Sequence, residues 1–332
     1  MQQLTINPMK RGLHMMIERE KRDYVHYIVS ETKAHNFDNI SRTKAYQNFY
    51  TIFPEIKWAF LASMVSRNAG WNMTDLALPP FRTILSDTQR ERLFMTYERA
   101  NWLIFSDAYP QLLIYKLSLK LSKPMFHLLP ELHVSRFMQK EWTYFWKHKD
   151  TQRLMISLII NEQNVIHGPV IKQDYFKYRV FLRPPYLLQD ILSLNAVLLP
   201  TRSATLYGAF VHDFTNIDKR IVLGKKIASI MFNPTVYDAL YDFARSVEHT
   251  GSRMDYERFL GIKMDKAPLL RTIYPVISHQ DNIRSDWYKS GGIKQKWTEN
   301  LCRDRQSPGI QKTFYNRRKL LYAYYHLRDI FA

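Results

Sequence analysis

Two glutamates lie on apolar helical stripes, where a charged side chain is least expected. Glu98 occurs with Phe94 and Asn101 at three- and four-residue spacing, and Glu162 follows Leu158 in the same way. An unpaired charge in an apolar interior costs several kcal/mol, roughly the stability of a small domain. Each carboxylate therefore needs a partner or a proton.

One hypothesis is that Glu98, Asn101, Glu162 and Asn164 line a common polar pocket, with Arg67 or Arg253 as counter-charge. Two neighbouring carboxylates push one pKa upward, which supplies the acid and base of hydrolytic or metal-assisted chemistry. The alternative is that each carboxylate is held by a structural Arg or Tyr. The candidate catalytic residues are Glu98, Glu162 and His249.

Two polar segments could present backbone N–H groups, hydroxyls and a guanidinium to a phosphate or carboxylate. They are Glu248–Tyr256 and Ser66–Asn72. The competing interpretation is a glycine-capped helix corner in which Arg253 pairs with Glu248 or Asp255. The candidate ligand-binding residues are Arg67, Asn68, Asn72, Asp75, Asn101, Asp107, Asn161, Asn164, Ser252, Arg253 and Asp255.

Common catalytic motifs are absent from the sequence. It contains no G-x-G-x-x-G, P-loop, G-x-S-x-G or H-E-x-x-H, and no glutamate has a histidine three residues later. His212-Asp213, with His167, His249 and Asp255, is the remaining hint of a metal-dependent phosphohydrolase, but such a dipeptide is also expected by chance. We assign no cofactor and no metal site from sequence.

The charge balance points to an anionic partner. The 48 Lys and Arg against 30 Asp and Glu give a net charge of +18, which suits nucleic acid, another polyanion or an anionic membrane surface. A solvated basic surface that aids solubility is the competing interpretation.

The C-terminal region is both basic and aromatic. Its candidate phosphate contacts are Lys294, Lys296, Arg303, Arg305, Lys312, Arg317, Arg318 and Lys319. Trp297, Tyr315 or Tyr322 could stack on exposed bases. Alternatively, a tail helix packs these aromatic rings on the core and exposes only its charges.

Cys302 is the single cysteine, so an internal disulfide and a thiolate metal cluster are excluded and a reducing compartment fits. The first residues have no apolar signal-peptide core, and no apolar run is long enough to span a membrane. The sequence predicts a cytoplasmic protein.

Local signals predict the helices that would position the two glutamates. Ser86–Gln89 has the form of a capping box and begins a long helix, which is expected to pass into a second helix at Pro110. Gly70 is expected to end the preceding helix, and Gly70–Leu76 to form a turn. Ser135 and Asp150 are expected to cap two later helices.

Weaker signals continue along the chain. Thr205–His212 and Asn216–Phe232 are predicted helices, and Pro184 opens another through Leu194. Tyr178–Leu182 is the one stretch in which a strand is as plausible as a helix.

These patterns predict an all-α protein, an irregular packing of many helices with little or no sheet. We expect one domain over residues 1–332, with a looser basic region over 262–332 and at most a weak boundary near residue 170.

Four strings resemble a family of uncharacterised proteins from Bacillus-type bacteria, catalogued only as a domain of unknown function. They are Arg67–Asp75, Glu98–Gln111, Ile160–Asn164 and Glu248–Arg253. The resemblance spans most of the chain and implies a bacterial, cytoplasmic protein. It implies no activity, cofactor or site residue.

Overall fold

The centre of the fold is helix α3 (Lys57–Asp75) in the computed structural model. All of its 19 residues except Lys57 and Val65 are buried, although seven of the buried ones are polar or charged. A helix enclosed on every side must find partners for each polar side chain. Its neighbours include α2 (Asn39–Ile52), α5 (Asp87–Lys120), α7 (Thr151–Val165), α11 (Ile217–Met231), α14 (Leu270–Ile273) and β1 (Ala196–Pro200).

The structure describes residues 8–173, 196–211, 213–262, 264–280, 285–289, 292–299 and 309–331. Its elements are α1 (Pro8–His35), α2 (Asn39–Ile52), α3, α4 (Pro79–Ile84), α5 (Asp87–Lys120), η1 (Phe126–Leu132), α6 (Arg136–His148), α7 (Thr151–Val165), η2 (His167–Ile171), β1 (Ala196–Pro200), β2 (Leu206–Phe210), α11 (Ile217–Met231), α12 (Tyr237–Ser246), α13 (Met254–Leu260), α14 (Leu270–Ile273), α15 (Gln295–Thr298) and α16 (Gln311–Phe331).

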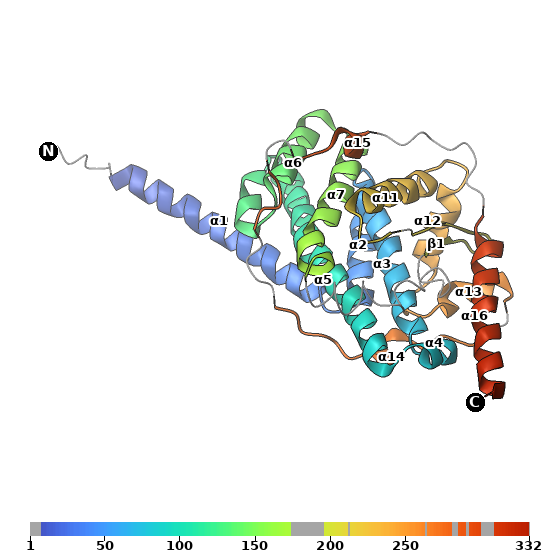
Figure 1. The fold of residues 1–332 in the computed structure, drawn as a ribbon. Helices are drawn as coiled ribbons and strands as arrows, with labels where there is room; N and C mark the ends of the chain where they lie inside the picture. Colours follow the sequence, from blue (N-terminus) through green and yellow to red (C-terminus); the bar gives the residue numbers. More distant parts are fainter. Residues whose placement is uncertain are drawn as a thin grey trace.

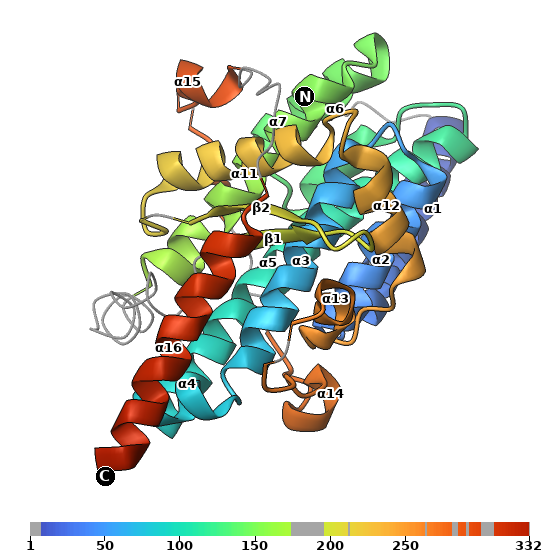
Figure 2. The ribbon, with the colours of Figure 1, turned by 90° about the vertical axis from the view of Figure 1, so that its right-hand side faces the viewer.

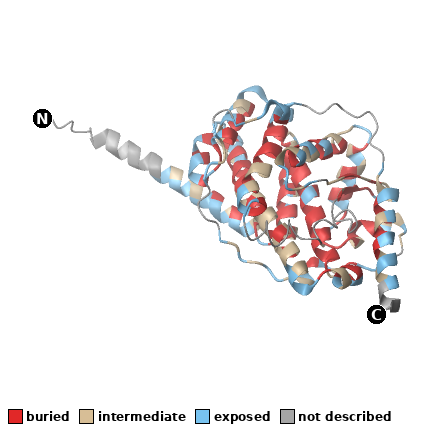
Figure 3. Ribbon diagram, in the orientation of Figure 1, coloured by how far each residue is buried: buried red, intermediate tan, exposed pale blue. Residues whose placement is uncertain are grey.

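The helices surround α3 without a repeating arrangement. α1 extends away from the body, and α16 lies along the opposite side (Figure 1). A second view shows α3 between α5 and α13, with α16 across the front (Figure 2). Buried residues run through the middle of this assembly, and exposed ones cover its outer faces (Figure 3).

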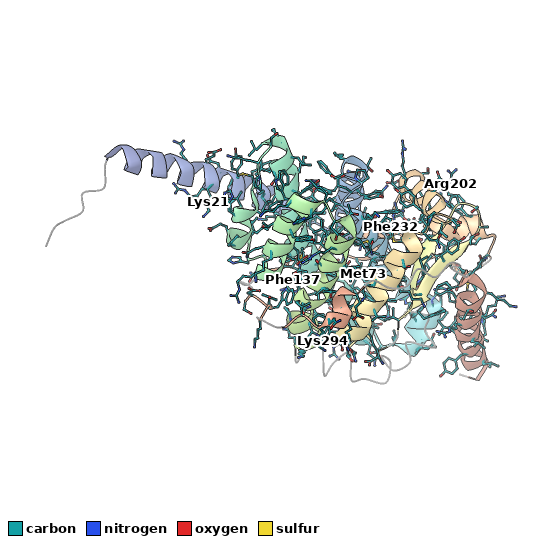
Figure 4. All side chains as sticks on the ribbon, turned by 90° about the horizontal axis from the view of Figure 1, so that it is seen from above. Lys21, Met73, Phe137, Arg202, Phe232 and Lys294 are labelled. Atoms are coloured by element: carbon teal, nitrogen blue, oxygen red, sulfur yellow. The ribbon has the colours of Figure 1, made fainter. Side chains whose placement is uncertain are left out.

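The main hydrophobic core draws residues from both sides of residue 170, from Ile28 in α1 to Tyr315 in α16. Met73 lies inside the body whereas Lys294 lies at its edge (Figure 4). The all-α prediction with little sheet is confirmed for the described residues. The continuous core is consistent with the expected single domain.

Helix starts that depend on local capping are confirmed. Ser86 forms the complete capping box with Gln89 at the start of α5. Ser135 and Asp150 accept hydrogen bonds from the first turns of α6 and α7, and Asn216 does so for α11. A short side-chain acceptor satisfies N–H groups that have no partner within the helix.

The helix end predicted at Gly70 is wrong, and so is the turn over Gly70–Leu76. α3 continues through Gly70 to Asp75. A Cβ at Gly70 would lie 2.5 Å from Asn39 Oδ1 and 3.0 Å from the His249 ring. The glycine therefore makes room for two packed side chains and does not end the helix.

The second helix predicted at Pro110 is also wrong, because α5 is one helix from Asp87 to Lys120 with Pro110 inside it. Proline removes one backbone hydrogen bond from a helix interior, a cost that tertiary packing can offset. Pro110 and its neighbours from Asp107 to Tyr115 are all buried.

The predicted helix over Thr205–His212 is wrong because Leu206–Phe210 forms strand β2. It pairs antiparallel with β1, and Leu198 faces Gly208. Asn68 of α3 binds the backbone of Leu198, donating to its O at 2.7 Å and accepting from its N at 2.7 Å. A five-residue apolar run has no distinguishing period, so its pairing with β1 and the contact of β1 with Asn68 decide its structure.

Two expected elements, over Tyr178–Leu182 and Pro184–Leu194, lie outside the described residues.

We predict that Gly70→Ala destabilises the protein by about 1–3 kcal/mol, although alanine favours helices. The added methyl group would displace Asn39 or His249. Thermal melting measures the effect, with Gly168→Ala as the control because nothing lies within 4 Å of a Cβ built there. Equal melting temperatures for the two variants would contradict the tight packing at Gly70.

Candidate functional site

Asp75 at the end of α3 holds two arginines from distant parts of the chain. Its Oδ2 accepts from Arg253 Nε at 2.6 Å and from Arg318 Nη1 at 2.8 Å. The side chains of all three are 1% exposed. Arg253 also donates to Asn72 Oδ1 at 3.0 Å and to the Tyr256 hydroxyl at 2.7 Å. These contacts fasten α16 and the start of α13 to α3.

A second carboxylate balances this cluster. Glu257 is buried and accepts a hydrogen bond from the Tyr315 hydroxyl at 3.1 Å. Burial raises the pKa of Glu257, while Arg318 and Arg253 oppose the rise. The Phe314 ring lies 5.3 Å from Arg253 and 5.9 Å from Arg318. Aromatic packing and acidic partners thus surround both guanidinium groups.

His249 and Asp255 form a separate buried pair beside Trp71. His249 Nε2 lies 2.8 Å from Asn39 Oδ1, and Nδ1 lies 3.3 Å from Asp255 Oδ2. Trp71 Nε1 donates to the same Asp255 oxygen at 3.1 Å. Burial lowers the pKa of His249, although Asp255 opposes this.

The Glu248–Tyr256 segment is a corner that is buried for the most part, although Glu248 is exposed. Arg253 pairs with Asp75, instead of the Glu248 or Asp255 partners considered from sequence. The Ser252 hydroxyl donates to Ala267 O at 2.6 Å. Thr250 Oγ1 donates to Asp255 Oδ1 at 2.6 Å, which closes the turn.

Arg67 is directed at the end of α12. Its Nη2 donates to Ala244 O and Val247 O, each at 2.9 Å, and to Gln47 Oε1 at 3.1 Å. Carbonyls at a helix C-terminus attract a cation. Burial lowers the pKa of Arg67 to about 10. Its other two guanidinium nitrogens have no hydrogen-bond partner among the described residues.

Glu98 is held by Arg42 of α2, a residue that the sequence interpretation did not single out. Arg42 Nη2 donates to Glu98 Oε2 at 2.5 Å, and the two side chains are 1% and 6% exposed. His279 Nε2 lies 3.6 Å from the other oxygen. Burial would raise the pKa of Glu98, but Arg42 and His279 outweigh it and keep the pKa below its usual value. Arg42 was detectable, since it shares a helical stripe with Tyr46 and Phe49.

A small cleft of about 250 Å³ lies beside Glu98, between α5 and α14. Phe94 and Tyr274 stack at 3.9 Å along it. Asp38 and Arg271 form a two-pronged ion pair at its edge, with an Nε to Oδ2 distance of 2.6 Å.

The Glu162 carboxylate accepts hydrogen bonds from two neutral side chains. Trp58 Nε1 donates to its Oε2 and Gln163 Nε2 to its Oε1, each at 3.0 Å. Burial raises the pKa of Glu162 to about 7, although both hydrogen bonds favour the charged form. Gln163 in turn accepts a hydrogen bond from Arg220 Nε through its Oε1 at 2.8 Å.

Asp107 and Asn161 belong to one buried network in the core. Asn161 Nδ2 donates to Asp107 Oδ2 at 2.6 Å, and Gln111 donates to the same oxygen at 2.8 Å. Asn161 Oδ1 accepts from Ser135 and from Trp287, each at 3.0 Å. Together these contacts bind α5, α6 and α7 to residue 287.

The hypothesis of a common pocket receives no support from these contacts. Asn101 and Asn164 each donate to a carbonyl of their own helix, Tyr97 O and Ile160 O. Glu98 and Glu162 have different partners, and Arg67 and Arg253 bind neither of them. The polar interior is therefore several local clusters.

Six of the eight candidate phosphate contacts are paired, buried, packed on an aromatic ring or outside the described residues. Arg303 and Arg305 lie outside the described residues. Lys294 and Lys296 pair with Asp218 at 3.0 and 2.7 Å, and Arg318 is buried on Asp75. Arg317 lies 4.1 Å from the centre of the Phe210 ring.

The remaining two lysines, Lys312 and Lys319, line a groove of about 970 Å³ on α16. Both are exposed and have no acidic partner among the described residues. Tyr322 and His326 line the same groove, and Asp265 is its acidic residue. Trp297 and Tyr315, two of the three candidate stacking rings, are buried.

His167 and His249, two histidines of the metal-site hypothesis, contact different residues. His167 Nδ1 lies 3.3 Å from Arg220 Nη2, and burial followed by Arg220 lowers its pKa to about 4. His212 lies outside the described residues. Within the described ranges, no group of three His, Cys, Asp or Glu side chains is placed to hold a metal ion.

Across the described residues, every helix is too short or too polar to cross a membrane.

Fold and side-chain contacts together define a helical protein with a buried polar scaffold and a basic groove on its last helix. The chain belongs to the family described as "Protein of unknown function (DUF2515)", whose model matches residues 34–317. It is 49% identical over 269 residues to "Uncharacterized protein YppC" of Bacillus subtilis strain 168, covering 81% of this chain and 84% of that protein. No solved structure matches the chain. The predicted resemblance is confirmed.

We predict that Glu98→Gln lowers the free energy of unfolding by about 3 kcal/mol or more, because Arg42 would keep a buried charge without its partner. Chemical denaturation measures the loss. The control is Glu98→Gln combined with Arg42→Met, which removes both charges and should recover much of the stability. An unchanged stability in Glu98→Gln alone would assign the carboxylate a role other than ion pairing.

We predict that Glu162 makes the protein less stable as the pH rises. Its pKa is about 7 when folded and near 4.3 when unfolded, so the folded state holds the proton more tightly. The resulting stabilisation, on the order of 3 kcal/mol, is complete below about pH 4 and disappears as the pH passes through 7. Glu162→Gln should remove this dependence, which melting curves between pH 5 and 8 can measure. Parallel curves for the wild type and the variant would contradict the raised pKa.

Proposed function

We propose that the protein binds a polyanion, with single-stranded nucleic acid as the first candidate, in the groove on α16. The observation that supports this proposal is the pair of unpaired lysines, Lys312 and Lys319, which line that groove on one helix. Seven residues separate them, which is about two helical turns, or roughly 10 Å. Phosphates of one extended strand, though not successive ones, can contact cations at such a spacing.

The other residues of the groove suit a nucleic acid strand. Tyr322 is half-buried and presents a ring on which a base could stack. Gln311 and Asn316 offer hydrogen-bonding groups along the same face, and His326 adds a group that can be charged. Asp265 reduces the positive charge of the groove without cancelling it.

The scaffold gives the groove a fixed wall. Arg318 lies next to Lys319 in sequence and is held on Asp75, so the lysine projects from an anchored turn of α16. Tyr315, also in the groove, is held on Glu257 at 3.1 Å. A preformed surface loses less conformational entropy on binding than a mobile tail.

We further propose that the protein acts in the cytoplasm and folds as one domain. A single cysteine among 332 residues supports action in the reducing cytoplasm. The core shared by segments before and after residue 170 supports one domain.

We predict that Lys312→Gln with Lys319→Gln weakens binding of a single-stranded oligonucleotide and flattens its salt dependence. Each lost phosphate contact should reduce the slope of log affinity against log salt by about 0.7, which gives a change of about 1.4 for the pair. Fluorescence polarisation over a range of salt concentrations measures both quantities. Lys44→Gln with Lys226→Gln is the matched control, because these lysines of α2 and α11 are also exposed, have no acidic partner among the described residues and lie outside the groove.

Wild-type protein that fails to bind the oligonucleotide, or binds it without salt dependence, would reject the proposal. An equal loss in the two double variants would assign binding to net charge, not to the groove.

A further inference from the structure

A second basic surface lies at the end of α5, outside the C-terminal region. Lys116 and Lys120 on α5 and Lys123 just after it are exposed, as are Lys147 and Lys149 at the end of α6. In the described part of the chain, none of these five lysines has an acidic partner. We call this surface, together with Ile52, Leu119 and Trp146, the α5–α6 tip.

Aromatic packing brings the parts of the tip together around Tyr115. Its ring lies 5.9 Å from Phe53 at the end of α2 and 5.7 Å from Phe145 near the end of α6. Phe126 of η1 lies 5.9 Å from Trp146. The end of α6 and the turn after α2 share the upper end of the molecule in Figure 2.

Exposed apolar groups lie among these lysines. Ile52 is 62% exposed and Leu119 is 37% exposed. Leu119 lies one helical turn beyond Tyr115, on the same face of α5. Trp146 is half-buried, and Lys149 Nζ lies 4.4 Å from the centre of its ring. The tip therefore combines aliphatic, indole and ammonium groups on one surface.

Helix termini explain only part of this charge. Lysines in a last helical turn complement the carbonyls there, which accounts for Lys120 and Lys147. Lys116 and Lys120 are four residues apart, a like-charge spacing that destabilises a helix. The acidic groups near the tip are Glu55, which accepts from the Tyr115 hydroxyl at 2.6 Å, and Asp150, which caps α7. Five lysines against two carboxylates leave a clear positive excess.

We infer that the α5–α6 tip docks on an anionic lipid surface. Lysines attract acidic headgroups, and their long stems let neighbouring apolar groups enter the interface. Tryptophan favours the boundary between headgroups and hydrocarbon. Exposed isoleucine and leucine would add little to binding of a phosphate backbone, whereas in a bilayer they lose contact with water. A membrane therefore fits this surface better than nucleic acid does.

The test is flotation of the full-length protein with vesicles of phosphatidylglycerol and phosphatidylcholine in a one-to-three mixture. Pure phosphatidylcholine vesicles are the lipid control. We expect wild-type protein to float only with the anionic vesicles. The variant Lys116→Gln, Lys120→Gln, Lys123→Gln should bind roughly a hundred-fold more weakly, at about five-fold per lysine.

Two further variants make the test specific. Lys312→Gln with Lys319→Gln changes the groove and should float like the wild type. Ile52→Ser with Leu119→Ser should reduce flotation most at high salt, where charge attraction is screened. Because all these residues are exposed, melting curves should match the wild type.

Failure of the wild type to float, or equal flotation of the tip and groove variants, would overturn the inference. If the tip variant lost oligonucleotide binding as strongly as vesicle binding, the tip would be a nucleic acid surface instead. Because the groove and the tip are changed separately, the groove proposal can fail while this inference stands.

Discussion

The carboxylate of Asp75 is the constraint on which the arrangement of the C-terminal half depends. One oxygen accepts from Arg253 and Arg318, which lie 178 and 243 residues further along the chain. A buried arginine without polar partners costs several kcal/mol, and Asp75 supplies the charged partner that both of these arginines share. The start of α13 and the middle of α16 are thereby held at one end of α3.

The same principle governs the rest of the interior. Each buried charge has a partner that is close in space. Arg42 pairs with Glu98, and Arg67 donates to carbonyls at the end of α12. Such pairs favour one packing over alternatives even where they add little net stability. Polar side chains at α3 thus fix how its neighbours are arranged. The shape of the α16 groove depends on one of these contacts, that of Arg318 with Asp75.

Local features could be predicted from sequence, whereas features that depend on distant segments could not. The caps at Ser86, Ser135 and Asp150 are satisfied within a few residues, so their signals suffice. Gly70 is understood only once His249 packs beside it, and β2 only once Asn68 of α3 holds the strand with which it pairs. The spacing of apolar residues correctly predicted that Glu98 is buried. Its pairing with Arg42 of α2, and the fact that Glu162 has other partners, could be seen only in the tertiary structure.

The most direct test of this account is amide hydrogen exchange in Asp75→Asn compared with the wild type. If Asp75 fastens α16, the amides around Arg318 should lose protection by roughly a hundred-fold, which corresponds to about 3 kcal/mol. The amides of α7, which lies away from the cluster, should lose much less. Unchanged protection in α16, or an equal loss in α16 and α7, would contradict the claim that Asp75 anchors the last helix.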